Sequence, residues 1–525
     1  MGQRSFDVAR TRITLFDALL RARAEAGGKT RILEDHDRNV LTYDDLVRAA
    51  FALGGKLKAL TAPKEHVGVL LPSGVGATVV FFALHAIGRV PVMLNFTAGA
   101  ANIKGACKAA GVKRILTAHK FVEVGKLESL IEDLKGGIAL TFLEEVRAKV
   151  HLGDKLGALV KGFFPKSFRV GGNPDEPGVI LFTSGSFGAP KGAVLSHANI
   201  VANVEQVSAH VDFAPDWVFF NPLPMFHCYG LTGGTLLPLL IGRKVFLYPS
   251  PLHFKEIPQL IAECGANILF ATDTFAHQYA RSAKGDSLKC LKFCVLGAEK
   301  VKPETRELFQ RRFGVELLEG YGATEASPVI AVNQPNGQPG GANVHGTVGR
   351  LLPGMEVRLD DVPGISEGKK LVVRGPNVMR GYLLADGGLE ELEDGWHDTG
   401  DVVAIDDQGF VTIVGRVKRF AKIGGEMVSL NAVEGFASAV WPEHRHAAVS
   451  LPDPRKGERV VLLSDAPDAE PAKILEWAQK NGAPEIAVPK KVLKVAEIPV
   501  LGTGKTDYVT VQKMAEDALK LQDAA

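Results

Sequence analysis

Short apolar runs alternate with segments of helical periodicity through most of the chain. The apolar runs, bounded by Gly, Pro or Asp, read HVGVLLP, RILTA, GVILFT, KVFLYP, NILFAT and KFCVLG, and ATVVFFALHAIG has the period of a helix. After Ser196, the stripe Ile200, Val204, Val207 and Val211 predicts another helix with Ser196 as its N-cap. Buried parallel strands joined by covering helices produce this alternation. The pattern therefore predicts an α/β fold built from doubly wound sheets.

The pattern of predicted secondary structure changes near Lys370. The short alternating strands KLVVRG, DVVAID and FVTIVG follow, with turn residues between the last two. The C-terminal part mixes strands (HAAVSL, RVVLLS, VLKVAEIPV) with helices that begin near Pro471 and Thr506. We predict a large N-terminal domain over residues 1–415, with a β-rich subdomain at about 370–415, and an α+β domain over 416–525.

Composition and charge exclude several classes of protein. Lys and Arg number 61 and Asp and Glu 59, so the net charge of +2 lacks the basic footprint of a nucleic-acid binder. With 46% hydrophobic and 23% charged residues, the chain is neither disordered nor a coiled coil. A soluble α/β enzyme that does not bind nucleic acid fits best.

The cysteines and the N-terminal segment indicate a compartment. The five cysteines have no CxxC spacing, which favours free thiols in a reducing environment and disfavours structural zinc. The segment MGQRSFDVARTRITLFDALL lacks the continuous apolar core of a signal peptide. We expect a cytoplasmic protein.

Residues 143–169 leave membrane contact open. This segment interleaves Leu, Val and Phe with the basic residues Lys149, Lys155, Lys161, Lys166 and Arg169. One interpretation is a helix that lies on an anionic membrane surface, here the inner face of the membrane. The other is an ordinary surface helix and loop.

The most informative stretch runs from Thr183 to Gly192, TSGSFGAPKG, directly after the apolar run GVILF. Glycines let backbone N–H groups approach a polyphosphate, hydroxyls donate hydrogen bonds, and a lysine offsets negative charge. Pro190 before Lys191 excludes a Walker loop. A flexible surface turn is the alternative. A second GKT, at Gly504 to Thr506, is no Walker loop either, because Pro499 occupies the position of the first glycine.

Several motifs together resemble the adenylate-forming superfamily of acyl-CoA synthetases, luciferase and peptide-synthetase adenylation domains. In the family's order they are the phosphate loop at 183–192, YGATE at 321–325, WHDTGD at 396–401, the hinge motif GRVK at 415–418 with Lys422 and Gly425 after it, and Gly504-Lys505. The resemblance covers nearly the whole chain. It implies a mobile C-terminal domain that moves about a hinge at Lys418 and carries a catalytic lysine, Lys505.

The resemblance assigns roles toward ATP and Mg²⁺. The catalytic residues are expected to be Lys505, Thr324, which donates to the α-phosphate, and Glu325, which also ligates Mg²⁺. The expected nucleotide-binding residues are Thr183, Ser184, Gly185, Ser186, Gly188, Lys191, Gly297, Ala298, Glu299, Tyr321, Gly322, Asp401 and Arg416. Their chemistry fits, since lysines neutralise phosphates, carboxylates suit Mg²⁺ and ribose hydroxyls, and a tyrosine ring can stack on adenine. Each residue taken alone also has an ordinary surface or turn interpretation.

The acyl-binding region is less distinct. His227, in PMFH, together with Thr272 and Phe275, resembles the substrate-binding region, and a satisfied core histidine is the alternative for His227. Phe187 departs from the family, which often has Glu or Thr there, and we expect altered loop closure from it.

A narrower resemblance favours one acceptor. FLYPSPLHF, LEGYGATEASPV and PVLGTGKTDYVT are similar to the acyl-[acyl-carrier-protein] synthetase half of bacterial 2-acylglycerophosphoethanolamine acyltransferases. The acyltransferase half carries an HxxxxD motif that this sequence lacks, so we expect no glycerolipid acyl transfer from this chain alone.

We therefore predict an acid–thiol ligase of fatty acid metabolism. It forms an acyl-adenylate from a fatty acid and ATP and passes the acyl group to the phosphopantetheine thiol of acyl carrier protein. The carrier protein would dock on the basic residues Arg416, Lys418, Arg419 and Lys422 or on the C-terminal surface. The alternatives are a long- or medium-chain fatty acid–CoA ligase and, in another class, a non-catalytic lipid-binding scaffold.

Overall fold

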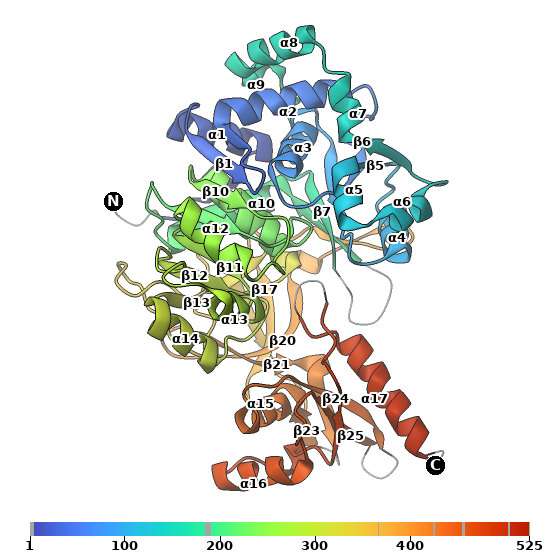
Figure 1. Cartoon of the computed structure of the whole chain (residues 1–525), viewed down its shortest axis with the longest axis vertical. Helices are drawn as coiled ribbons and strands as arrows, with labels where there is room; N and C mark the ends of the chain where they lie inside the picture. The colour runs from blue at the N-terminus through green and yellow to red at the C-terminus, as the bar shows by residue number, and fades with distance from the viewer. Residues whose placement is uncertain are drawn as a thin grey trace. The chain divides into compact units, whose positions relative to one another are not determined.

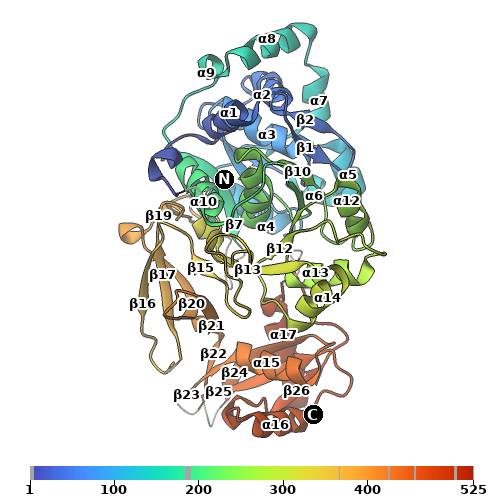
Figure 2. The same cartoon turned by 90° about the vertical axis from the view of Figure 1, so that its left-hand side faces the viewer.

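The computed structural model describes residues 5–183, 191–365, 367–423, 426–453, 457–501 and 505–523. The chain divides into two compact units (Figures 1 and 2). Unit 1 comprises Met1–Glu356 and Arg374–His397, and unit 2 comprises Val357–Val373 and Asp398–Ala525. Both units combine sheets with helices, so the predicted α/β class is confirmed.

The described part of unit 1 contains a sheet of nine strands in the order β15-β14-β13-β12-β11-β9-β10-β1-β2. Neighbours from β13 to β1 are parallel, and β2, β14 and β15 join antiparallel at the two edges. The strands are Arg31–Asp35 (β1), Val40–Thr42 (β2), Val218–Asn221 (β9), Lys244–Leu247 (β10), Ile268–Ala271 (β11), Phe293–Leu296 (β12), Glu316–Gly322 (β13), Val329–Val332 (β14) and Arg350–Leu351 (β15).

A second sheet in the described part of unit 1 has eight strands in the order β19-β18-β8-β7-β4-β3-β5-β6. Its strands from β7 to β6 are parallel, and β8, β18 and β19 are antiparallel. The strands are His66–Val69 (β3), Val90–Met93 (β4), Arg114–Thr117 (β5), Ala139–Phe142 (β6), Pro177–Thr183 (β7), Lys191–Ser196 (β8), Gly381–Leu383 (β18) and Leu389–Glu391 (β19). Every apolar run in the first group of strand predictions lies on a strand of one of these two sheets.

Helices cover both sheets of unit 1. The largest hydrophobic core joins residues of the two sheets with α1, α3 and α10. Helix α10 begins as predicted, because the Ser196 hydroxyl accepts a hydrogen bond from Asn199 N at 3.1 Å. The helices are Leu15–Ala26 (α1), Tyr43–Leu57 (α2), Val75–Ala86 (α3), Ala100–Ala109 (α4), His119–Gly125 (α5), Glu128–Leu134 (α6), Leu143–Ala148 (α7), Leu152–Phe163 (α8), Pro165–Phe168 (α9), His197–His210 (α10), Leu237–Leu240 (α11), Glu256–Cys264 (α12), Asp273–Ser282 (α13) and Pro303–Phe313 (α14), with 3-10 turns at Val8–Thr11 (η1), Thr324–Ala326 (η3) and Glu393–Gly395 (η4) and a π-helix at Tyr229–Leu236 (η2).

The described residues of unit 2 form a four-stranded sheet, β16-β17-β20-β21, and a five-stranded sheet in which β26 joins the path β23-β22-β25-β24. One core cluster packs α15 and α16 against the five-stranded sheet, and another packs α17 against it. The elements are Glu356–Asp360 (β16), Lys369–Arg374 (β17), His397–Ile405 (β20), Val411–Arg416 (β21), Val417–Arg419 (η5), Phe420–Ile423 (β22), Glu426–Ser429 (β23), Leu430–Val440 (α15), His446–Asp453 (β24), Gly457–Ser464 (β25), Pro471–Asn481 (α16), Glu485–Ala487 (η6), Lys491–Lys494 (β26) and Tyr508–Asp523 (α17).

The boundaries of the two compact units differ from the predicted domain boundary at residue 415. The β-rich strands within 357–373 and 398–416 group with the C-terminal part of the chain rather than with the large N-terminal body. Compactness and mobility are separate properties, so a hinge at Lys418 stays a prediction.

The cysteines and the apolar helices are unremarkable in the fold. All five cysteines are free, and burial raises the pKa of the Cys107 and Cys228 thiols to about 12, which keeps them protonated and unreactive at neutral pH. Among the described helices, none combines the length and the hydrophobicity that a membrane crossing needs.

Candidate active site

The carboxyl ends of adjacent parallel strands bring four predicted segments to one edge of the nine-stranded sheet. Strands β9, β11, β12 and β13 are successive neighbours, with Ala271 opposite Leu296 and Leu296 opposite Glu319. The segments that hold His227, Thr272 and the turn 297–299 follow β9, β11 and β12, and the motif 321–325 begins in the last two residues of β13. Ligands of open α/β sheets bind outside the carboxyl ends of the strands. This edge is therefore the candidate nucleotide and substrate site.

The turn Gly297-Ala298-Glu299 is held between two elements. Glu299 Oε2 accepts a hydrogen bond from Thr274 N, 2.9 Å away at the start of α13. On the other side, a Cβ at Gly297 would lie 3.4 Å from the ring of Tyr229, whose hydroxyl donates to Val295 O at 2.7 Å. Ala298 has φ of +71° and is exposed, and the contact of this turn with adenine stays a prediction.

The motif 321–325 leaves β13 and forms the 3-10 turn η3. A Cβ at Gly322 would come within 2.1 Å of Pro328 O, so this close approach of the two chain segments requires glycine. Two buried amides anchor the segment: Asn377 Nδ2 donates to Ala326 O at 2.7 Å, and Asn203 Nδ2 donates to Val329 O at 2.8 Å. Tyr321, Thr324 and Glu325 are half-buried on this anchored frame.

The two ends of the predicted phosphate loop are joined by the β7–β8 ladder. Thr183 pairs with Lys191, and the Thr183 hydroxyl donates to Lys191 O at 3.4 Å. Lys191 Nζ lies 3.8 Å from Glu390 Oε2 and 5.0 Å from the ring centroid of Tyr382. The other predicted loop residues, Ser184, Gly185, Ser186 and Gly188, and the divergent Phe187 lie outside the described residues.

Tyr382 contacts both Lys191 and Glu325, although it lies outside every motif of the sequence. Its hydroxyl donates to Glu325 Oε1 at 2.5 Å while its ring lies under the Lys191 ammonium. Burial, and then the charge of Glu325, raise the pKa of Tyr382, so the hydroxyl remains a donor at neutral pH. No spacing pattern could reveal this contact, because Tyr382 is on β18 and reaches Glu325 only after β18 pairs with β8.

Replacing Tyr382 with phenylalanine tests this link. The ring under Lys191 stays, but Glu325 loses a hydrogen bond to a charged group worth about 1.5 to 3 kcal/mol. We expect kcat/KM for pyrophosphate release in the predicted adenylation to fall about tenfold or more, with a higher Mg²⁺ requirement. In a double-mutant cycle with Glu325→Gln the two losses should not add. Fully additive losses would show that Tyr382 does not act through Glu325.

The predicted acyl-binding residues have defined places in the fold. Thr272 is buried and caps α13, its hydroxyl accepting from Phe275 N at 3.4 Å. Phe275 is 2% exposed and belongs to the main core. His227 is half-buried, 4.6 Å from the Phe226 ring between centroids, just before the π-helix η2. Their role toward an acyl group stays a prediction, and for Phe275 the structure shows a packing role.

Asp273, beside Thr272, gives the site region a pH dependence. Burial raises the pKa of Asp273 to about 6, although its Oδ1 accepts a hydrogen bond from Lys302 N at 3.1 Å. The pKa of Asp273 is therefore higher in the folded than in the unfolded chain, so proton binding stabilises the fold. This contribution is complete below pH of about 4 and is lost as pH rises through about 6.

We therefore expect the free energy of unfolding of the wild type to fall by about 1 to 2 kcal/mol relative to Asp273→Asn between pH 5 and 7.5. Asparagine keeps an acceptor for Lys302 N, so the comparison isolates the charge. Urea denaturation across this range measures it, and parallel pH profiles of the two proteins would contradict the assignment.

The predicted ribose-binding residues lie in unit 2 and are paired with each other. Asp401 on β20 faces Arg416 on β21, and Arg416 Nε donates to Asp401 Oδ1 at 2.7 Å. The Asp401 side chain is 5% exposed and that of Arg416 61% exposed. Arg416 thus holds a buried carboxylate in place while presenting most of its own surface to solvent.

The predicted hinge and catalytic lysines are both exposed in unit 2. Lys418 lies in the 3-10 turn between β21 and β22. Leu501 N donates to Lys505 O at 2.7 Å, and Val500 pairs with Thr506. Asp507 then accepts from Thr510 Oγ1 at 2.7 Å and caps α17. Gly425 and Gly504 lie outside the described residues.

Arg419, predicted with Lys418 as part of a docking surface, is used inside unit 2. Its guanidinium donates to Ala448 O at 2.7 Å and to Glu434 Oε1 at 2.6 Å, and it stacks 3.7 Å from the ring centroid of Tyr508. These contacts leave the side chain 14% exposed, so Arg419 offers little surface to a partner, and docking at the basic residues stays a prediction.

The residues present fit ATP and Mg²⁺. Within the described part of the chain, no three or more His, Cys, Asp or Glu side chains are grouped to hold a metal ion. Mg²⁺ is commonly held by one or two carboxylates together with substrate phosphates and water, so a single carboxylate such as Glu325 suits it. Lys191 supplies charge for the phosphates, and the buried Asp401 is a ribose-type acceptor.

Comparison with protein families identifies the chain. Residues 20–383 match the profile of the AMP-binding enzymes. The chain belongs to the AMP-binding enzyme family. The match takes in the carboxyl ends of β9 to β13, the strands that flank the predicted phosphate loop, and Tyr382, and the roles of the individual site residues stay predictions.

Curated relatives and solved structures agree with the family. The chain is 29% identical to a feruloyl-CoA synthase of Amycolatopsis sp over 487 residues, which cover 90% of this chain and 93% of the relative. It is 27% identical to a long-chain-fatty-acid–CoA ligase of Escherichia coli O157:H7, covering 90% of this chain and 84% of the relative. ATP-bound MatB from Rhodopseudomonas palustris has the same fold, with a TM-score of 0.81, 23% identity, and coverage of 96% and 99%. Family and relatives support the predicted acid–thiol ligase.

Proposed function

We propose that this AMP-binding enzyme is a fatty acid–CoA ligase. The observation that carries the proposal is the cluster of Lys191, Tyr382 and Glu325 beside the carboxyl ends of β11 to β13, which joins a cation and an oriented carboxylate at one edge. The relatives named above that act on a carboxylic acid and coenzyme A support the substrates. They favour coenzyme A over acyl carrier protein as the acceptor.

The first half-reaction requires two anions to meet. A fatty acid carboxylate oxygen attacks the α-phosphorus of ATP, and pyrophosphate leaves with the electron pair of the broken P–O bond. Lys191 offsets the charge of the β- and γ-phosphates, and Glu325, held by Tyr382, ligates Mg²⁺, which neutralises the phosphates when bound. The backbone of the turn 297–299 and the Tyr321 ring hold adenine, and Thr324 donates to the α-phosphate.

Unit 2 supplies the remaining groups of the proposal. Asp401 accepts from the ribose hydroxyls with Arg416 as its partner, and Lys505 stabilises the charge that develops between carboxylate and α-phosphate. In the second half-reaction a thiol sulfur attacks the acyl carbonyl and AMP leaves. A rotation of residues 416–525 about Lys418 relative to residues 1–415 would exchange the groups that the two steps need.

Acyl carrier protein is the second candidate acceptor. Arg416, Lys418 and Lys422 are exposed within a short stretch of unit 2, which suits an acidic protein carrying a phosphopantetheine thiol. The resemblance to acyl-[acyl-carrier-protein] synthetases adds to this candidate. The cytoplasm, where both acceptors occur, is the proposed location.

A competition experiment tests the function and the acceptor together. Purified protein is mixed with ATP, Mg²⁺ and palmitate, with coenzyme A and holo acyl carrier protein in one reaction, and both thioesters are measured by mass spectrometry. Palmitoyl-CoA as the main product supports the proposal, and acylated carrier protein as the main product supports the second candidate. Pyrophosphate release that no fatty acid stimulates would contradict both and leave the non-catalytic scaffold.

A further inference from the structure

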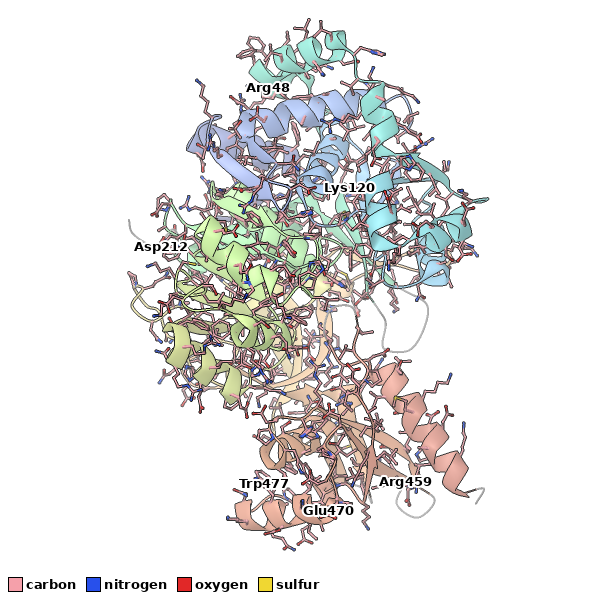
Figure 3. The ribbon with its side chains drawn as sticks, viewed as in Figure 1. Arg48, Lys120, Asp212, Arg459, Glu470 and Trp477 are labelled. Atoms are coloured by element: carbon pink, nitrogen blue, oxygen red, sulfur yellow. The ribbon has the colours of Figure 1, made fainter. Side chains whose placement is uncertain are left out.

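Helices α8 and α9 form the outer layer of unit 1 over α2 (Figures 1 and 2). The contact with α2 uses small and polar residues. Ala158 and Gly162 are buried, Asp154 Oδ2 lies 2.7 Å from Lys56 Nζ, and a Cβ at Gly162 would be 2.9 Å from Cγ of Arg48, which Figure 3 labels at this junction. The inner face of α8 is therefore narrow and only weakly apolar.

The outer face of α8 and α9 is strongly apolar. Leu152 is 72%, Phe163 67% and Phe164 64% exposed. On α8 the apolar residues recur at spacings of three and four, so they share one side of the helix, and the helix is about 18 Å long. We call this the α8–α9 face, and its exposed apolar members are Leu152, Leu156, Leu159, Val160, Phe163, Phe164 and Phe168.

This arrangement inverts the usual amphipathic helix. A surface helix of a globular protein turns its large apolar side chains toward the core and its polar ones toward water. Here the large apolar side chains face water and the small ones face the protein, although both sets were available to the fold. Large exposed apolar side chains that share one side of a helix mark an interaction surface.

Basic residues border the α8–α9 face and indicate what covers it. Lys149, Lys155 and Lys166 are exposed and make no ion pair among the described residues, and Lys161 is half-buried. Between Lys149 and Lys166 the one acidic residue is Asp154, and it is turned inward to Lys56. Apolar side chains with a border of lysines match the interface of a bilayer that contains anionic lipids.

A second copy of the chain fits the same face poorly. A two-fold interface would bring the face against itself, and the unpaired lysines of the two copies would then meet. Like charges placed together in this way oppose association.

We propose that the α8–α9 face binds the surface of membranes that contain anionic lipids, with α8 parallel to the membrane plane. The leucine and phenylalanine side chains enter the boundary between headgroups and acyl chains, and the lysines contact the phosphates. This proposal does not depend on the chemistry assigned to the active site.

Vesicle flotation tests the proposal on the full chain. Wild type is incubated with vesicles of phosphatidylcholine and phosphatidylglycerol and with vesicles of phosphatidylcholine alone. We expect binding to the anionic vesicles that weakens with salt, and at least tenfold weaker binding to the neutral ones. Equal binding to both, or no binding to either, would overturn the proposal.

Matched variants separate the apolar and basic contributions. Phe163→Ser with Phe164→Ser, and separately Lys149→Gln with Lys155→Gln and Lys166→Gln, should each weaken binding to anionic vesicles at least tenfold. The controls change equally exposed residues elsewhere: Val124→Ser with Leu252→Ser, and Lys104→Gln with Lys108→Gln and Lys113→Gln. The controls should bind as wild type does. Loss of binding in controls and variants alike would contradict the assignment to this face.

A local reporter and the oligomeric state complete the test. Phe163→Trp should add a blue-shifted emission component on anionic vesicles relative to wild type. Sedimentation of wild type without lipid should show a monomer. A dimer that Phe163→Ser with Phe164→Ser dissociates, together with no blue shift, would assign the face to self-association instead.

Discussion

Replacing Lys505 with alanine is expected to lower the rate of fatty-acid-dependent pyrophosphate release by about 10²- to 10³-fold, the cost of removing one preorganised donor from developing charge. The backbone oxygen of Lys505 accepts a hydrogen bond from Leu501 N, so the ammonium can be removed without removing that hydrogen bond. Stopped-flow or coupled-enzyme measurement of pyrophosphate gives the rate. Lys505→Arg, which keeps the charge, should retain more activity than Lys505→Ala.

Two comparisons make this result specific to the first half-reaction. Thioester formation from a preformed acyl-adenylate should change less than about threefold, because Lys505 is assigned to adenylation alone. Lys494→Ala, which removes another exposed lysine of unit 2, should leave both half-reactions unchanged. Wild-type adenylation by Lys505→Ala would remove Lys505 from the mechanism and leave the acceptor proposal standing.

The largest effect on stability is expected at Arg419. Its guanidinium joins Glu434, Ala448 O and the Tyr508 ring, while the Tyr508 hydroxyl donates to Glu434 Oε2 at 3.1 Å. Arg419→Met would leave the largely buried Glu434 carboxylate without its counter-ion. Because both side chains keep some exposure, we expect a loss of about 2 to 3 kcal/mol, below the cost for a fully buried pair.

The pH dependence of this loss has a defined sign. Burial raises the pKa of Glu434, and Arg419 opposes that shift. Without Arg419 the pKa rises further, so Arg419→Met should lose more stability at pH 8 than at pH 5, where Glu434 can bind a proton. Adding Glu434→Gln should recover part of the loss, whereas Lys418→Met, at the exposed neighbour, should cost less than about 0.5 kcal/mol.

Urea denaturation followed by hydrogen–deuterium exchange in α15 and β24 measures these changes within unit 2. A loss of the same size for Lys418→Met and Arg419→Met would contradict the buried-pair assignment. A loss that does not vary with pH would contradict the role of the Glu434 charge.

Local sequence patterns were sufficient to predict several strands, including those that precede predicted site segments. The apolar runs before Thr272, Gly297 and Thr183 are the strands β11, β12 and β7, because a buried strand requires a continuous apolar run whatever its neighbours are. Ser196 caps α10 for a similarly local reason, since the cap and the amide it accepts from are three residues apart.

The contacts that join distant parts of the site could not be predicted in this way. Tyr382 and Glu325 meet because β18 pairs with β8, and nothing in the sequence near Tyr382 encodes that pairing. Arg419 lies in a basic stretch of sequence that is typical of an exposed docking surface. Its burial against Glu434 and Tyr508 depends on how α15 and α17 pack on the sheet. Side-chain partners far apart in sequence are set by packing, which local propensity does not specify.

The α8 helix shows the division most clearly. Its sequence by itself determined an apolar stripe and a basic border, because the helical period of 3.6 residues places Leu152, Leu156 and Phe163 on one side. Only the tertiary structure decided which side faces water. Gly162 and Ala158 let α8 approach α2 closely, so the small side packs inward and the large apolar side is left exposed. The helical period determines which side chains share one side of a helix. Packing against the neighbouring helix determines which of these sides faces the protein and which faces water.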